Sequence, residues 1–275
     1  MIWFLTALAA LAASTPEDSI LNRAERPWVL EPSAELGFLA PLSHTIQFGR
    51  DGTDDFSYIK EGGQDNLFLV ARLAMDVRVG PNKRNTFTLL YQPLDLQTTR
   101  EVERPLVFDG VRFAEGGVNF RYGFDFYRGS WTWDFLADED AEFGFGASLQ
   151  IRNANIQFTS ADGEKRTTNR NIGPVPVLRM RGRWDGDVGF YGFEVDGFYA
   201  PIKYLNGGDS DVVGAIADAS FRAGLKGSNG IEPYLNLRYI GGGAEGTSAR
   251  PDPGKDGYTE NWLHVATLTV GAYVR

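Results

Sequence analysis

Residues 66–79, NLFLVARLAMDVRV, decide the fold because their side chains alternate strictly along the chain. Leucine, alanine, methionine or valine occupies every odd position from 67 to 79, whereas Arg72, Asp76 and Arg78 occupy even positions. Successive side chains of a β-strand point to opposite faces, so this two-residue period predicts a strand with one wholly apolar face. The segment is also longer than an ordinary globular strand of about 5–6 residues.

The same alternation recurs over most of the chain and predicts an all-β protein of about twelve strands. We expect these strands at 33–49, 66–80, 84–93, 105–113, 115–128, 130–136, 142–159, 171–184, 187–200, 211–226, 230–243 and 258–274. The segments 105–113 and 130–136 are the weakest because they are short. Without them ten strands remain, which is also an even number, as in single-chain bacterial barrels.

The predicted connections alternate in length. Tight turns follow the even-numbered strands, at 81–83, near 114, and at 137–141, 185–186 and 227–229. Longer polar loops follow most odd-numbered strands, at 50–65, 94–104, 160–170, 201–210 and 244–257, and the short turn expected at 128–130 is the exception. Outer-membrane barrels have this pattern of short periplasmic turns and long extracellular loops.

The first 32 residues differ from the rest. Residues 1–13, MIWFLTALAALAA, are apolar and uncharged, too short to span a bilayer as a helix, and are followed by small residues, which predicts a cleaved signal peptide over 1–14. Residues 15–32 lack alternation and are expected to form a periplasmic lead-in, with the barrel over 33–275. Beyond the signal no apolar stretch approaches 18 residues, so membrane residence requires strands.

Together these features resemble the bacterial outer-membrane β-barrel class, in the export segment, the long alternating strands and the closing segment 261–275, NWLHVATLTVGAYVR. The resemblance implies a closed antiparallel transmembrane β-barrel with an up-and-down meander, located in the bacterial outer membrane. Aromatic residues near strand ends, such as Trp131, Trp133 and Trp262, fit interfacial girdles. A secreted β-sandwich or a soluble barrel also alternates and is the competing interpretation.

The polar face of the predicted strands is rich in arginine and carboxylate and poor in lysine, which favours a confined lumen because the planar guanidinium group pairs with carboxylates in two-pronged geometry. We expect the lumen to be lined by Arg72, Asp76, Arg78, Arg121, Asp125, Arg152, Arg179, Arg181, Glu194, Asp196, Asp218, Arg222, Glu232 and Arg238. Neighbouring strands are expected to pair these charges, which predicts a narrow or closed channel.

No catalytic, cofactor or metal site emerges from the sequence. His44 follows Ser43, which a strand places on the opposite face, and His264 has no serine two positions away, so both histidines are expected to be structural. Glu194 and Asp196 share one face and offer either acid–base chemistry or, as we prefer, pairing with Arg179 and Arg181.

Composition limits the partners. The formal net charge of −9 argues against nucleic acid, since phosphate binding needs a basic surface. The absence of cysteine excludes disulfides and a lipid-modified thiol. The expected partners are outer-membrane lipid, the barrel-insertion machinery and small solutes.

Three functional hypotheses follow. The first is a narrow passive, porin-like pore or a structural barrel with a charge-paired lumen. The second is an envelope enzyme that modifies lipid or lipopolysaccharide, although the sequence favours a protein without enzymatic activity. The third is surface recognition or adhesion through the loops at 50–65, 160–170 and 244–257, since binding residues often lie on loops.

The third hypothesis predicts that these loops are exposed on the cell surface. Protease added to intact cells should cut the chain within 50–65, 160–170 or 244–257, and mass spectrometry of the released peptides identifies the sites. Complete protection of all three segments on intact cells, with cutting after lysis, would argue against their exposure.

Overall fold

The computed structural model describes residues 27–50, 53–136, 138–201, 211–227, 230–247 and 256–275, without the side chains of 152, 171 and 172. Its strands are β1 (Trp28–Phe48), β2 (Phe56–Ser57), β3 (Phe68–Val79), β4 (Asn85–Gln92), β5 (Asp95–Val102), β6 (Leu106–Phe108), β7 (Val111–Phe113), β8 (Gly116–Asp134), β9 (Ala141–Ser160), β10 (Arg166–Asp185), β11 (Gly189–Pro201), β12 (Val213–Leu225), β13 (Ile231–Thr247) and β14 (Tyr258–Val274). No helix in this part of the chain is long and apolar enough to cross a membrane.

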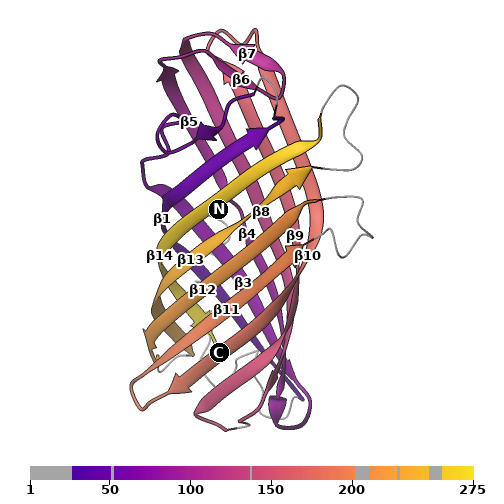
Figure 1. Ribbon diagram of the computed structural model, residues 1–275. Helices are drawn as coiled ribbons and strands as arrows, with labels where there is room; N and C mark the ends of the chain where they lie inside the picture. The colour runs from indigo at the N-terminus through magenta and orange to yellow at the C-terminus, as the bar shows by residue number, and fades with distance from the viewer. Residues whose placement is uncertain (1–26, 51–52, 137, 202–210, 228–229, 248–255) are drawn as a thin grey trace.

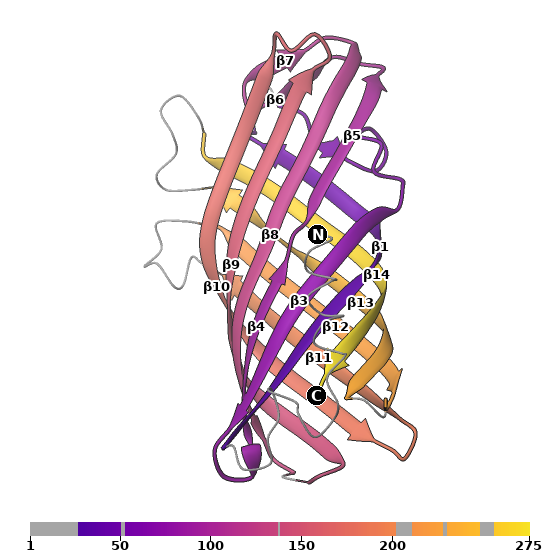
Figure 2. The same ribbon diagram turned by 180° about the vertical axis from the view of Figure 1, so that it is seen from behind.

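The strands close into an antiparallel barrel in chain order (Figures 1 and 2). The ring runs β1, β3, β4, β8, β9, β10, β11, β12, β13 and β14, and β1 pairs with β14 to complete it, whereas β2 lies beside β1 and β6 and β7 form a separate hairpin. β5 continues the line of β4 along β8, so the two count as one wall element and the barrel has ten. The all-β fold and the closed meander are confirmed, with ten barrel strands, the alternative to twelve.

Two of the expected strands, 105–113 and 130–136, are not separate strands of the barrel wall. The segments 115–128 and 130–136 form the single strand β8, so the turn expected at 128–130 is wrong. The segment 105–113 forms the separate hairpin β6–β7, whose turn residues Asp109 and Gly110 both have positive φ (51° and 78°). Asp-Gly between apolar runs is a strong signal for such a turn.

Other boundaries also differ from those expected. The segment 94–104, which the sequence predicts to be a loop, forms β5. β10 begins at Arg166, which shortens the loop predicted at 160–170 to a turn. β1 begins at Trp28, ahead of the predicted start at 33, and the expected signal peptide 1–14 lies outside the described residues.

The alternation of apolar and polar residues changes at 128 because the inward side chains of β8 become polar there. The strand itself continues without a turn. Even-numbered residues of β8 point inward throughout: valine, phenylalanine and tyrosine at 118–126, then Arg128, Ser130 and Thr132. On β9 the change runs the other way along the chain, from Ser148 and Gln150 to the apolar side chains at 154–158. The inward face of these strands is therefore polar in the lower part of the barrel and apolar in the upper part.

The outward face changes in the opposite sense. Below the change it is apolar and exposed, with Trp131 on β8 and Leu149 on β9. Above it the outward residues are polar, for example Arg121 on β8, which pairs with Asp95 of β5 at 2.8 Å. The lower half thus has a polar interior and an exposed apolar surface, as expected for a barrel wall in lipid, whereas the upper half has an apolar core and a polar surface, as expected in water.

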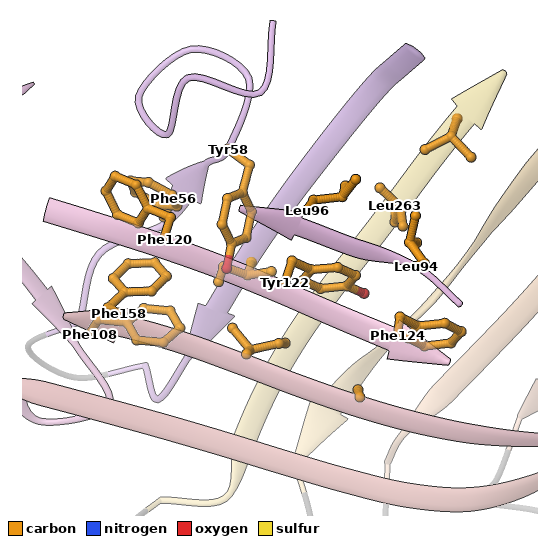
Figure 3. Close-up of a cluster of buried hydrophobic side chains, with 14 of the residues drawn as sticks. Phe56, Tyr58, Leu94, Leu96, Phe108, Phe120, Tyr122, Phe124, Phe158 and Leu263 are labelled. Carbon is orange, nitrogen blue, oxygen red and sulfur yellow. The ribbon is translucent and has the colours of Figure 1, made fainter. Parts of the chain in front are cut away.

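The upper half is taller on one side, where β5, β8, β9 and β10 rise above the ends of β11–β14 (Figures 1 and 2). The inner face of this wall is covered by β2, by Tyr58 directly after it and by the β6–β7 hairpin, whose buried side chains form one cluster with those of β8 and β9. Their aromatic rings pack closely, with Phe108 stacked on Phe158 at 4.0 Å and Phe56 against Phe120 at 4.9 Å (Figure 3). We call this packed set of β2, β6 and β7 on the tall wall the aromatic cap.

The position of the lipid boundary on β9 is testable by paired arginine substitutions on its outward face. Ala147→Arg places a charge inside the apolar belt and should destabilise the barrel by about 2–4 kcal/mol. Asn153→Arg lies above the change and should cost less than about 0.5 kcal/mol. Denaturant unfolding in lipid vesicles measures both, and an equal loss would contradict the assigned boundary.

Candidate functional site

The lower lumen is filled by an ion-pair network of balanced charge. Eight carboxylates meet eight guanidinium groups there, and Asp185 and Arg275 extend the network at its lower end, so the described carboxylates and guanidinium groups are equal in number. The eight of each kind are Glu31, Glu35, Asp76, Glu142, Glu194, Asp196, Asp218 and Glu232 with Arg72, Arg78, Arg128, Arg179, Arg181, Arg183, Arg222 and Arg238.

Glu194 on β11 is the centre of the network. Its carboxylate accepts from Arg72 of β3 at 3.1 Å, from Arg179 of β10 at 3.0 Å and from Arg222 of β12 at 3.0 Å. Since β3 and β11 lie five places apart in the ten-strand ring, the contact with Arg72 spans the full lumen. Arg72 also donates to Glu35 of β1 at 2.8 Å, which ties both walls to one group.

Further pairs cross the lumen above and below this centre. Above it, Arg128 of β8 reaches Asp218 of β12 at 2.7 Å. Below it, Arg181 of β10 reaches Asp76 of β3 at 2.8 Å, and Arg78 joins Glu142 of β9 at 2.8 Å.

Water is largely excluded from these pairs. The exposed fraction of the side chain is 0% for Arg179 and 4% for Arg72, and both partners of the Arg128–Asp218 pair are below 5%. At low local dielectric each pair is strong, but each lost partner leaves an uncompensated buried charge. The network therefore joins opposite walls of the lumen, and the loss of any one partner is costly.

The structure places most of the predicted lumen residues in this network. The side chains that point inward are those of Arg72, Asp76, Arg78, Arg179, Arg181, Glu194, Asp196, Asp218, Arg222, Glu232 and Arg238. Arg179 faces Asp196 at 2.7 Å across β10 and β11, as the preferred pairing required, whereas Arg181 turns to Asp76 and Glu142 instead of Glu194.

Three predicted positions are not among them. Arg121 and Asp125 lie on the outward face of β8, because the inward face of this stretch is the apolar one. The side chain of Arg152 is outside the described part of the structure.

Five members of the network, Glu31, Glu35, Arg128, Glu142 and Arg183, are not among the lumen residues expected from the sequence. Glu31 lay in the expected lead-in and Arg128 in an expected turn, so their faces were not assigned. Glu35 follows Glu31 at even spacing, and Arg183 continues the alternation of Arg179 and Arg181, so the two-residue period alone could have identified both.

The histidines stand apart from the network. His44 of β1 is buried beside the aromatic cap, stacked on Tyr58 at 4.2 Å between ring centroids, with its Nδ1 2.7 Å from Gln64 Oε1. His264 lies on the outward face and contacts the Tyr239 hydroxyl at 2.6 Å. Although Ser43 is the cross-strand neighbour of His264, no hydrogen bond joins their side chains in the described structure. Within the described residues no group of three potential ligands is placed to hold a metal ion.

A cavity of about 220 Å³ lies between the ion-pair network and the aromatic cap. Its walls include Tyr122, Phe124 and Phe126 of β8, and Ile216 and Ile240 of the opposite wall. Figure 3 shows Tyr122 near Tyr58, with Phe124 farther along the same strand and away from the cap residues. We call this cavity the upper chamber. It is strongly apolar, unlike the lumen directly below it.

Comparison with known proteins finds similar solved structures but no related sequence. No family model and no curated sequence matches the chain. Among solved structures, the outer membrane protease OmpT from Escherichia coli aligns with a TM-score of 0.49 at 9% identity, over 90% of this chain and 96% of that one. A Pseudomonas aeruginosa FadL homologue gives 0.39 at 8% identity over 89% and 90%.

The transport unit of the autotransporter AIDA-I from Escherichia coli gives 0.40 at 10% identity over 98% of this chain and 97% of that one. These proteins are bacterial outer-membrane β-barrels to which the chain is similar in structure, and its own strand pairings show a closed antiparallel barrel. At these identities the activities of the three proteins do not transfer.

The central role of Glu194 is testable by removing its charge. Glu194→Gln leaves Arg72, Arg179 and Arg222 with one carboxylate fewer in a buried site, so unfolding should be easier by about 3–5 kcal/mol. Asp95→Asn, which breaks the exposed pair with Arg121, should cost about 0–1 kcal/mol. Denaturant titration in lipid vesicles compares the two, and similar losses would argue that the network contributes no more than a surface pair.

Proposed function

We propose that this outer-membrane β-barrel is a closed structural barrel and not an open diffusion pore. The observation that carries the proposal is the set of ion pairs that join opposite walls of the lumen at three heights. A hydrated ion or small solute would have to separate such pairs as Arg72 and Glu194, which lie 3.1 Å apart. Separation would leave buried charges without partners, which is costly.

The periplasmic end fits the same proposal. A polar vestibule of about 670 Å³ opens there, lined by Lys83, Asp134 and Asp138 among others. Its inner wall includes Arg78 and Glu142, which are joined at 2.8 Å. Water that fills the vestibule therefore meets the lowest layer of the network and not a passage.

The extracellular end supports a role for the upper half of the barrel. The aromatic cap covers the inner face of the tall wall at its upper end. Phe56, Phe108 and Phe158, which pack together there, are almost completely buried. A barrel closed at both levels serves as a rigid membrane anchor for the structures above it. Outer-membrane lipid is the partner that its apolar belt supports.

The enzyme hypothesis has less support. The carboxylates of Glu194 and Asp196 both accept hydrogen bonds from arginine side chains, at 3.0 Å and 2.7 Å respectively for Arg222 and Arg179. A general acid or base must exchange protons with a substrate. Two carboxylates that are buried and held by guanidinium groups are poorly suited to that task.

Planar-bilayer recording tests the proposal. The refolded wild-type protein should give no steady conductance, and the double substitution Glu194→Ala with Arg72→Ala should introduce one by removing the central pair. Asp95→Ala with Arg121→Ala, on the water-facing surface, should remain silent. A steady conductance in the wild type that resembles an open porin would overturn the proposal.

A further inference from the structure

We propose that the upper chamber binds a slender, uncharged apolar molecule of about ten carbon atoms, which enters from the side of the barrel between β10 and β11. The proposal rests on the pairing of these two strands, on the chemistry of the chamber walls and on its volume. It goes beyond the closed barrel, which requires no ligand.

The wall of the barrel is incomplete at the level of the chamber. β10 pairs with β11 from Asp185 up to Leu178, which faces Gly197. Above this point, in the described structure, β10 pairs with β9 alone and β11 pairs with β12. Had the register continued, Pro176 would lie opposite Tyr199, yet the two strands separate there.

Two prolines lie on the unpaired stretch of β10. Pro174 and Pro176 carry no N–H and cannot donate to a neighbouring strand. Within sheets proline is confined to edges and irregular positions, and the edge of β10 toward β11 is such a place. Because they are two residues apart, both side chains lie on the outward face. The position of the break between β10 and β11 thus follows from two prolines in the sequence.

Both edges of the break contribute to the chamber walls. Pro174, Val175 and Pro176 line it from β10, and Phe198 and Ala200 line it from β11. The chamber is closed below by the ion-pair network, since Gln150 lines it and accepts a hydrogen bond from Arg128 at 3.1 Å. Above, Tyr122 belongs both to the chamber wall and to the hydrophobic cluster of the cap. The chamber is therefore open toward the side of the barrel where, among the described residues, β10 and β11 are not paired.

The mouth lies at the rim of the lipid-facing belt. Leu178, directly below the break, points outward with 54% of its surface exposed, and Tyr199 beside the break is 65% exposed. Large apolar groups at such exposure belong in lipid or at its interface. An apolar molecule dissolved in the outer leaflet therefore reaches the mouth without crossing water.

The walls select against charge. No Asp, Glu, Lys or Arg is among the described residues that line the chamber. Its polar side chains are already engaged, as the Tyr122 hydroxyl donates to Asn261 at 3.2 Å and the Gln150 carbonyl accepts from Arg128. An ionised ligand head would be buried without a partner, which is costly, whereas a hydrocarbon chain needs none.

The volume limits the size of the ligand. A dry protein cavity of about 150 Å³ is sufficient to hold benzene. The chamber, at about 220 Å³, is roughly half as large again, which corresponds to a chain of about ten carbons in close packing. A complete two-chain lipid is too large, so the inferred ligand is a single chain or a small hydrocarbon.

Photolabelling in lipid nanodiscs tests the proposal, with a ten-carbon alcohol that carries a diazirine near its terminal carbon as the probe. In the wild type, adducts mapped by mass spectrometry should fall on peptides that contain Ile216 and Ile240. Excess 1-decanol should suppress them, and decanoate should compete at least about tenfold less well because its carboxylate finds no cation.

Filling the chamber should abolish these adducts. A Cβ built on Gly214 has its nearest neighbours at 3.6 and 3.9 Å, so Gly214→Phe can extend into the space and should lower labelling by about tenfold. Ala217→Phe, which adds the same ring on the lipid-facing side of β12, is the control and should label like the wild type. Gel mobility with and without heating reports folding, and Ala200→Phe from β11 replaces Gly214→Phe if that variant does not fold.

The route is tested by a tether across the mouth. The chain has no native cysteine, so Pro176→Cys with Tyr199→Cys can be joined by a short bis-maleimide. The tether should slow labelling of Ile216 and Ile240 several-fold relative to the unjoined double variant. Labelling restricted to lipid-facing residues, or unchanged by Gly214→Phe, would overturn the ligand site, and an unchanged rate in the tethered protein would overturn the side entry.

Discussion

The convergence of three guanidinium groups on Glu194 is the interaction on which the lower barrel depends. Arg72, Arg179 and Arg222 come from three strands, and one of them from the opposite wall. In a medium of low dielectric such a group is stable only when its charge is matched, because burial of an unpaired ion is expensive. Each strand must therefore present its charge at the correct height. A register slip of one residue would turn the paired charges toward lipid, so the network also specifies the strand register.

Above this network the same strands continue in the same direction, but the residue types on their inward and outward faces are exchanged. Inward positions of β8 change from Arg128 to Phe126 within one two-residue step, while the outward positions change from apolar to polar. The exposed apolar surface of the lower half suits lipid and leaves the polar side chains to the interior, whereas the polar surface of the upper half suits water and leaves the apolar side chains to the core. Where the two interiors meet, the upper chamber remains between them. The break between β10 and β11 lies at this junction.

The fold was accessible from the sequence wherever one chemistry occupied one face for a full strand. The segment around Arg72 and Asp76 is such a case, and so is the pairing of Arg179 with Asp196, which follows from the two-residue period and a tight turn between their strands. Arg121 and Asp125 were assigned to the lumen because polar residues were equated with the inside, an equation that holds only below the membrane boundary.

Arg128 was placed in a turn for a related reason, since a change of chemistry along a continuous strand resembles the end of one. The β6–β7 hairpin needed its Asp-Gly turn to be recognised within an apolar run. The contacts across the lumen, such as Arg72 with Glu194, depend on which strands face each other in a closed ring of ten. Neither period nor spacing contains that information, so these contacts required the three-dimensional structure.

The closure of the lumen is measured most directly by the reactivity of a single cysteine at its centre. Ser148 is 6% exposed, and its hydroxyl donates to Asp196 at 2.8 Å, so Ser148→Cys is a small change in a chain without other cysteines. In folded protein in lipid vesicles, a charged, membrane-impermeant thiol reagent added to both sides should leave this cysteine unmodified until the barrel is unfolded. Rapid modification of the folded protein at a rate close to that of an exposed cysteine would contradict a closed lumen.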